Sequence, residues 1–215
     1  MRRISLNGAW TADLGQGPVT ALVPGCWEQL TESKVLTGPV DYKRSFVCPK
    51  VSPGGRWLLV FDAVSYYCEA SINGRPVGSH EGLWDRFSFD ITDALLPEGP
   101  NELTLSIEKP GYAPADRFPL REVLSGFIPD VLCTFGGIWG DVGLIETPGL
   151  LAENCTVQTD LTRGMATIAV EAPGSFRDGT IVIRLLRAGA ALFEGSLASP
   201  GASTASLEIP LRGLR

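Results

Sequence analysis

The sequence contains a single histidine, His80, among its 215 residues. Serine and cysteine nucleophiles usually need a histidine base, and structural zinc sites need clustered His and Cys ligands. A lone histidine in a loop segment such as 78–82 is more often a surface or supporting residue than a catalytic one. The phosphate-binding pattern G-x-x-x-x-G-K is also absent. We therefore expect no catalytic triad, no metal site and no cofactor.

Paired cysteine motifs are missing as well. The five cysteines are odd in number and widely spaced, and no two of them form a C-x-x-C pair: Cys26, Cys48, Cys68, Cys133 and Cys155. This pattern argues against a disulfide framework. We interpret them as reduced, mostly buried thiols, and we expect a cytoplasmic protein.

Positive charge and long apolar runs are both scarce. The 18 Lys and Arg residues are outnumbered by 24 Asp and Glu, which gives a formal net charge of -6. No basic surface is therefore expected for nucleic acid. Apolar runs such as 57–61 are far shorter than the roughly 18 residues of a membrane helix. No apolar signal segment follows Arg2 and Arg3, so we expect the fold to begin near Met1 and to have no membrane partner.

Alternating hydrophobicity dominates what is present. Apolar residues occupy every second position of 87–91 and of 103–107, as expected for strands with one buried face. The run 57–61 is continuously apolar and short, which predicts a strand buried on both faces. These patterns, with 25 glycines and 16 prolines as turn residues, predict an all-β protein.

Local turn signals connect these strands. Asn73-Gly74 predicts a type I′ hairpin, because both residues tolerate positive φ angles. Pro76 then indicates an edge strand or an irregular one. Asp90 could cap one helical turn through Leu95 and Leu96, which the turn at 99–101 would end.

A second domain is expected after the turn at Pro148-Gly149. We predict one domain at 1–148 and another at 149–215, because new apolar or alternating runs begin behind this turn at 156–161, 165–170, 180–186 and 205–209. An immunoglobulin-like sandwich has about seven strands in about 100 residues, whereas this segment offers about four or five. The second sandwich is therefore predicted to be incomplete.

Several short motifs occur in a specific order between residues 6 and 146. They are Leu6-Asn7-Gly8-Ala9-Trp10, Val23-Pro24-Gly25-Cys26-Trp27, Tyr42-Lys43-Arg44-Ser45-Phe46, Ile72-Asn73-Gly74 with Val77-Gly78, Phe87-Ser88-Phe89-Asp90-Ile91-Thr92, Asn101-Glu102-Leu103, and Gly137-Ile138-Trp139 with Val142 and Leu144. In this order the chain resembles the N-terminal sugar-binding domain of glycoside hydrolase family 2, which includes β-galactosidases, β-glucuronidases and β-mannosidases.

The resemblance implies a fold and a location for the catalytic residues. The fold would be a galactose-binding-domain-like jelly-roll sandwich followed by a partial immunoglobulin-like β-sandwich. In this family, retaining hydrolysis uses two carboxyl groups, about 5 to 5.5 Å apart, on a (β/α)8 barrel that follows the sandwiches, and the acid is a glutamate preceded by asparagine. The sole Asn-Glu here, Asn101-Glu102, looks instead like a turn residue and a solvent-facing strand residue. The chain is thus expected to lack the barrel, to contain no catalytic residue and to be inactive by itself.

The resemblance also suggests sugar contacts. In family 2 enzymes the loop before Gly-Ile-Trp reaches the active site, and Asp130 stands near the position of an aspartate that touches the sugar. A carboxylate can accept hydrogen bonds from two adjacent hydroxyls. Asp116 and Asp41 are weaker candidates. Trp84 and Trp139 could stack on sugar rings, although packing against the protein is the alternative reading for both.

One position departs from the family pattern. Gly140 follows Gly-Ile-Trp where the family usually has a polar or basic residue, so an expected contact between domains is in doubt. The implied partners are a carbohydrate, as a β-glycoside, and the protein's own catalytic barrel.

Two other functions remain open. The chain could be a free-standing carbohydrate-binding module that uses exposed aromatic residues such as Trp84. It could also be a structural or protein-binding sandwich that forms a homo-oligomer, because the edge left by the missing strands could pair with another copy.

Overall fold

The structure is a computed structural model that describes residues 2–33, 35–123, 134–147, 154–171, 180–198 and 204–211. Contacts divide the chain into two compact units, unit 1 (Met1–Pro148) and unit 2 (Gly149–Arg215). Strands form most of the described chain, which confirms the all-β class. In the described segments, no helix is long and apolar enough to cross a membrane.

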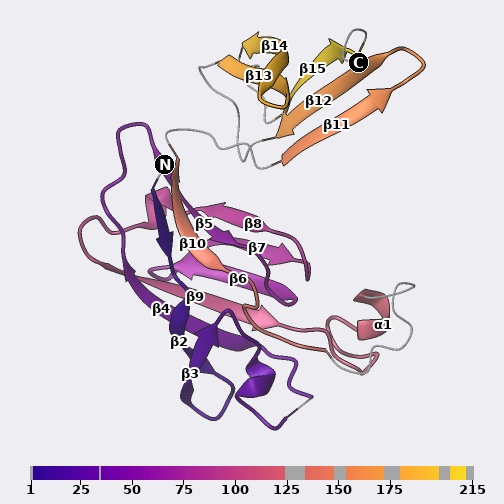
Figure 1. The fold of residues 1–215 in the computed structure, drawn as a ribbon. Helices are drawn as coiled ribbons and strands as arrows, with labels where there is room; N and C mark the ends of the chain where they lie inside the picture. The colour runs from indigo at the N-terminus through magenta and orange to yellow at the C-terminus, as the bar shows by residue number, and fades with distance from the viewer. Residues whose placement is uncertain are drawn as a thin grey trace. The chain divides into compact units, whose positions relative to one another are not determined.

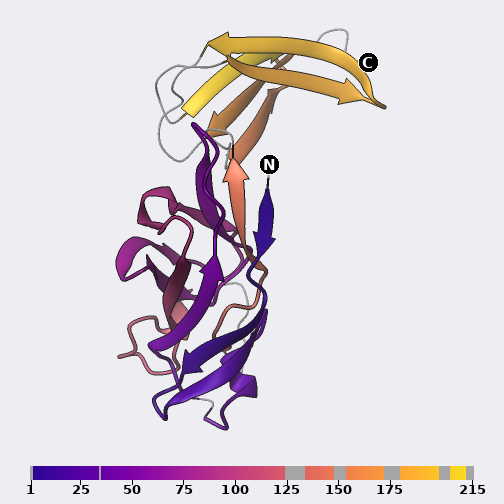
Figure 2. The ribbon, with the colours of Figure 1, turned by 90° about the vertical axis from the view of Figure 1, so that its left-hand side faces the viewer.

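Unit 1 is a sandwich of two sheets (Figure 1). The four-stranded sheet has the order β1-β10-β5-β8, and the six-stranded sheet has the order β3-β2-β4-β9-β6-β7. Both ribbon views show β1 beside β10 (Figures 1 and 2). The strands are β1 (Arg3–Ser5), β2 (Gly8–Asp13), β3 (Pro18–Val23), β4 (Val40–Val47), β5 (Arg56–Phe61), β6 (Tyr67–Ile72), β7 (Arg75–Glu81), β8 (Phe87–Asp90), β9 (Pro100–Glu108) and β10 (Val142–Thr147). The short helices are η1 (Trp27–Gln29), η2 (Thr92–Ala94) and α1 (Leu120–Val123).

The core of unit 1 follows the predicted alternation on β9 but not on β8. Leu103, Leu105 and Ile107 on β9 are fully buried, while the residues between them are half-buried. On β8, residues 87–89 are all half-buried. β5 lies between β10 and β8, and residues 57–61 are all buried. The prediction of a strand buried on both faces is therefore confirmed for β5.

Unit 2 contains the strands β11 (Asn154–Asp160), β12 (Met165–Glu171), β13 (Thr180–Arg187), β14 (Ala190–Ala198) and β15 (Thr204–Pro210). They form a three-stranded sheet, β11-β12-β15, and a hairpin, β13-β14. Its small core is built from alternate residues of β12 together with Ala205 and Ile209 of β15. An immunoglobulin-like topology for this unit stays a prediction.

The Asn73-Gly74 hairpin forms as predicted between β6 and β7. Both residues have positive φ angles, 53° and 76°. The side chain of Asn73 also bonds outside its own turn: its Oδ1 accepts the Glu102 N–H at 2.9 Å, and its Nδ2 donates to Asn101 Oδ1 at 2.8 Å. Asn73 therefore fixes the turn and attaches it to the start of β9.

The region between β8 and β9 differs from the sequence prediction in two details. The helical turn is the 3-10 turn η2, which ends before Leu95, and the Asp90 carboxylate accepts the Thr92 N–H at 3.0 Å just before it. Asn101 was predicted as a turn residue, and this is wrong. It lies in β9, only 1% exposed, and its Oδ1 accepts the Leu96 N–H at 2.7 Å. Its amide is thus used to close the 96–101 loop.

Each edge strand of unit 1 is short or contains proline. In the six-stranded sheet, the edge strand β3 starts at Pro18 and the edge strand β7 contains Pro76. The predicted edge position of Pro76 is therefore confirmed. In the four-stranded sheet, β1 has three residues and β8 has four.

Four of the five cysteines lie in the described residues, and all four are unpaired. Cys48 and Cys68 are buried, Cys26 is half-buried and Cys155 is exposed. Burial raises the pKa of the Cys68 thiol to about 12 and that of Cys48 to about 11. Cys133 lies outside the described residues.

A carboxylate near the end of β10 should make the stability of unit 1 sensitive to acid. Glu146 binds the Arg2 guanidinium and accepts the Ser52 N–H at 2.7 Å, and these bonds lower its pKa from 4.5 to about 2. A lowered pKa stabilises the folded state at neutral pH, and this contribution disappears as the pH falls from 4.5 toward 2. We expect Glu146→Gln to be less stable than the parent at pH 7 in urea denaturation, with the difference shrinking across that range. A constant difference would contradict the prediction. Glu102→Gln, on an exposed position of β9, is the control.

Candidate functional site

One end of the unit 1 sandwich carries the long connecting segments. β5, β7 and β9 end here, and β4, β6, β8 and β10 begin here, as their antiparallel registers show. The connections at this end are 24–39, 62–66, 82–86 and 109–141. The short helix α1 belongs to the last of them and lies away from both sheets (Figure 1). Loops held at one end of a rigid sandwich are a common place for binding residues.

Three aromatic rings meet at this end. Trp84 packs edge-on against Trp139, with the ring centroids 5.0 Å apart, and against Phe135 at 6.3 Å. Phe135 and Trp139 are 5.5 Å apart, also edge to face. Trp84 comes from the 82–86 segment and the other two from 134–141. We call these three residues the aromatic cluster.

The rings differ in exposure. Trp84 is 65% exposed, whereas Phe135 and Trp139 are half-buried. The indole N–H of Trp139 donates to the Leu83 carbonyl at 3.1 Å, which joins the two segments. Trp84 therefore presents apolar surface to solvent on a base that packing and a hydrogen bond hold in place. Such a surface can cover the C–H face of a sugar ring.

A buried ion pair lies beneath the 134–136 segment. The Lys109 ammonium, with a fully buried side chain, is 2.5 Å from Glu28 Oε1. The same carboxylate accepts the Gly136 N–H at 3.2 and 3.1 Å. The hydroxyl of Tyr112 accepts the Thr134 N–H at 2.8 Å. These bonds fix the backbone on both sides of Phe135.

Backbone contacts complete this support. Ser65 and Gly137 exchange both of their N–H···O bonds, at 3.0 and 3.3 Å, and the Ser65 hydroxyl donates to the Phe135 carbonyl. Trp27 N–H donates to the Gly136 carbonyl at 2.9 Å. A Cβ at Gly136 would lie 2.1 Å from the Trp27 ring, so this backbone approach requires glycine. The segment that carries Phe135 and Trp139 is thus rigidly seated.

Close approach of the backbone also explains why position 140 is a glycine. Its N–H donates to the Ala63 carbonyl at 3.0 Å, and a Cβ would meet Ala63 N at 2.4 Å. A polar or basic side chain does not fit there without moving the backbone. The departure from the family pattern therefore has a structural reason in this chain.

The predicted site residues are not all found together. Trp84 and Trp139 are brought into contact, while Asp130 lies outside the described residues. The Asp116 carboxylate accepts the Ala113 N–H at 2.8 Å and so stabilises its own turn. Asp41 is on an exposed position of β4. Neither of these two weaker candidates belongs to the aromatic cluster.

His80 lies in strand β7 and not in a loop segment, which corrects the expectation from the sequence. Its ring stacks on Phe87, with the centroids 3.8 Å apart, and burial lowers its pKa. The described segments contain no group of three His, Cys, Asp or Glu residues that could hold a metal ion.

Phe135, Lys109 and Glu28 were not among the predicted residues. The sequence carries a signal for Lys109: it continues the inward positions 103, 105 and 107 of β9, where a charged residue needs a buried partner. No comparable pattern marks Glu28 or Phe135, because both depend on how distant loops meet.

A comparison with protein families identifies one match. The family described as glycosyl hydrolase 2 galactose-binding domain-like matches residues 29–140, which is more than half of the chain. The matched range includes Trp84, Phe135 and Trp139.

Curated relatives are longer than this chain. The β-glucuronidase of Paenibacillus borealis is 24% identical over 185 residues, which cover 80% of this chain and 31% of the relative. The mannosylglycoprotein endo-β-mannosidase of Lilium longiflorum is 36% identical over 69 residues, 32% of this chain and 7% of the relative. The chain therefore spans less than a third of the length of these relatives.

Solved structures share the fold. The FMN-binding β-glucuronidase from Faecalibacterium prausnitzii L2-6 aligns with a TM-score of 0.66 at 22% identity, covering 98% of this chain and 34% of that one. A β-glucuronidase from Ruminococcus gnavus, solved with an N1-substituted uronic isofagomine, has the same TM-score at 17% identity and covers 97% and 40%.

Proposed function

The chain belongs to the family described as glycosyl hydrolase 2 galactose-binding domain-like, and from this premise we propose that it is a non-catalytic N-terminal part of a family 2 glycoside hydrolase. Unit 1 forms part of the wall of a sugar-binding pocket, and the catalytic carboxylates belong to a barrel outside this chain. The parent enzyme acts on a β-glycoside, and it is cytoplasmic. Unit 2 is an immunoglobulin-like sandwich in this proposal.

The aromatic cluster is the observation that carries this proposal. Trp84 is 65% exposed and packs against two further aromatic rings, Phe135 and Trp139. Clustered exposed apolar surface, in contrast to a single exposed side chain, is typical of a site that contacts a ligand or a partner. Trp84 follows Leu83, whose carbonyl accepts the Trp139 indole N–H, so the backbone of this segment is held in place. Trp84 also lies within the range that matches the family. The rigid base holds the ring in place before a sugar arrives, which lowers the entropy cost of binding.

Absence of turnover is the first expected result. The 215-residue chain should not hydrolyse nitrophenyl β-galactoside, β-glucuronide or β-mannoside, because it contributes no pair of catalytic carboxyl groups. The proposal would be overturned by turnover that co-purifies with the chain when the chain is prepared from a host without endogenous glycosidases.

Removal of the Trp84 ring should weaken sugar contact without unfolding the protein. Saturation-transfer NMR with methyl β-galactoside at millimolar concentration should show weak contact with the parent chain, and Trp84→Ala should reduce it roughly five- to tenfold. The thermal midpoint should hardly change, because the side chain is mostly exposed. Leu22→Ala, at a position 70% exposed on β3, is the control and should leave the contact unchanged. Equal signals from the parent chain and Trp84→Ala would refute a sugar contact at Trp84.

A carbohydrate-binding module is the second candidate, which the exposure of Trp84 also favours. The two candidates differ in affinity. A module should release measurable heat in calorimetric titration with oligosaccharides, whereas a piece of pocket wall should release little without the barrel.

A further inference from the structure

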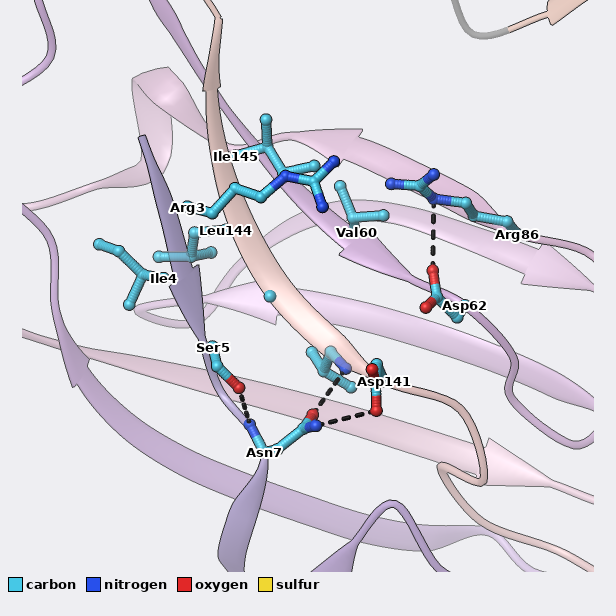
Figure 3. Close-up of a pocket in the computed structure, with 12 residues that line it drawn as sticks. Arg3, Ile4, Ser5, Asn7, Val60, Asp62, Arg86, Asp141, Leu144 and Ile145 are labelled. Atoms are coloured by element: carbon cyan, nitrogen blue, oxygen red, sulfur yellow. Dashed lines mark hydrogen bonds and ion pairs between the residues drawn. The ribbon is translucent and has the colours of Figure 1, made fainter. Parts of the chain in front are cut away.

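A cavity of about 240 Å³ lies on the outer face of the four-stranded sheet, separate from the aromatic cluster. Residues of β1, β5 and β10 line it, together with Asp62, Arg86 and Asp141 from the adjoining segments (Figure 3). The proposed pocket wall does not use these side chains.

The floor of this cavity is apolar. Val60 and Ile145 belong to neighbouring strands and are 6% and 4% exposed, although they are not part of the central core. Gly143 pairs with Val60 across the same strands and carries no side chain, so the floor is lowered at this point. A concave apolar floor with a few polar groups around it is typical of small-ligand sites.

Positive charge dominates one part of the rim. The guanidinium groups of Arg3 and Arg86 both extend over the region of Val60 (Figure 3). Arg86 is paired with Asp62 at 3.3 Å. Within the described residues, Arg3 forms neither an ion pair nor a hydrogen bond through its side chain. One guanidinium is therefore available for an incoming anion, and carboxylate is its usual geometric match.

Hydrogen-bonding groups occupy the other part of the rim. Asn7 Nδ2 donates to Asp141 Oδ1 at 2.9 Å, and Asn7 Oδ1 accepts the Val142 N–H at 2.9 Å. The Ser5 hydroxyl accepts the Asn7 N–H at 3.2 Å. These bonds orient the Asp141 carboxylate beside Asn7 (Figure 3), and its remaining lone pairs can accept hydroxyl groups.

We propose that this cavity binds a sugar acid, with its carboxylate on Arg3, its hydroxyls toward Asp141 and Ser5, and its C–H face over Val60 and Ile145. The volume is below the roughly 300–1,000 Å³ of pockets for drug-sized ligands, which suits a single ring. A neutral sugar would leave Arg3 unpaired, so the site discriminates by charge.

Titration with matched monosaccharides tests the proposal. Glucuronate and galacturonate are added to the full chain at low salt and followed by calorimetry and by chemical shifts, with glucose and galactose as neutral controls. We expect millimolar binding of the acids, at least tenfold weaker binding of the neutral sugars, and weaker acid binding at 0.5 M salt.

Variants locate the site. Arg3→Ala should weaken acid binding by about tenfold or more, because a charge-assisted bond is lost, while the thermal midpoint stays unchanged. Arg187→Ala, an exposed arginine on β13 of unit 2, should have no effect. Asp62→Asn should tighten binding several-fold, because it removes a negative charge from the rim and frees the Arg86 guanidinium, a gain that misfolding cannot produce.

Ligand binding at the cavity and at the aromatic cluster can be tested independently. Trp84→Ala should leave acid binding intact, and Arg3→Ala should leave contact with methyl β-galactoside intact. The proposal is overturned by equal binding of acids and neutral sugars, by acid binding that survives Arg3→Ala, or by the absence of acid binding at 20 mM.

Discussion

Lys109→Met is expected to lower the free energy of unfolding of unit 1 by about 3 kcal/mol, as for other buried ion pairs that lose one partner. The Lys109 side chain is fully buried and Glu28 is 16% exposed, so the carboxylate would keep its charge in a site with little water. The substitution also loosens the 134–136 segment, whose Gly136 N–H is bonded to Glu28. Urea denaturation measures the loss.

Two comparisons make this prediction specific. Adding Glu28→Gln to Lys109→Met should restore part of the lost stability, because the uncompensated charge is removed. Arg117→Ala breaks a neighbouring but more exposed pair with Glu108 and should cost under about 1 kcal/mol. If Lys109→Met lowered the free energy of unfolding no more than Arg117→Ala does, the buried pair would contribute no more to stability than the exposed one.

Gly140→Ala is expected to destabilise unit 1 by about 2–3 kcal/mol. The new Cβ would lie 2.4 Å from the backbone nitrogen of Ala63 and 2.9 Å from the carbonyl carbon of Asp62. Backbone atoms cannot rotate away as a side-chain end can, so the 62–66 and 134–141 segments must separate. Trp139 is the adjacent residue, and its fluorescence should shift toward that of a more exposed indole.

Gly99→Ala is the matched control, because nothing lies within 4 Å of the corresponding Cβ. It should change stability by less than about 0.5 kcal/mol. Similar losses for the two substitutions would mean that glycine flexibility, and not the close contact, determines the effect at position 140.

The sequence predicted the strands of unit 1 where the side-chain pattern is strict. Residues 57–61 and 103–107 lie in strands with the expected burial, and Asn73-Gly74 makes the expected turn. Prediction was less accurate where a polar side chain, and not another backbone group, forms a hydrogen bond with the main chain. Asn101 is buried because its amide closes a loop. The hydrophobic periodicity of the sequence gives no indication of such a bond.

The candidate site was predicted only in part for a related reason. Trp84 and Trp139 are conspicuous as large residues near turns, but their contact is made by segments 55 residues apart in the chain. Phe135 completes the aromatic cluster, and its place depends on Ser65, on Glu28 and on the two glycines that follow it. Contacts of that kind arise from tertiary packing, which a single sequence does not encode in a local pattern.

The edge strands of unit 1 bear on how this protein could associate with itself. A sheet grows by adding a strand to a free edge, and proline or a very short strand prevents this. In the described part of unit 1, Pro18, Pro76 and the short strands β1 and β8 protect all four sheet edges against a second copy. Among the described strands, β11 of unit 2 is better suited to self-association by strand addition, because it forms an edge of its sheet with seven exposed residues and no proline.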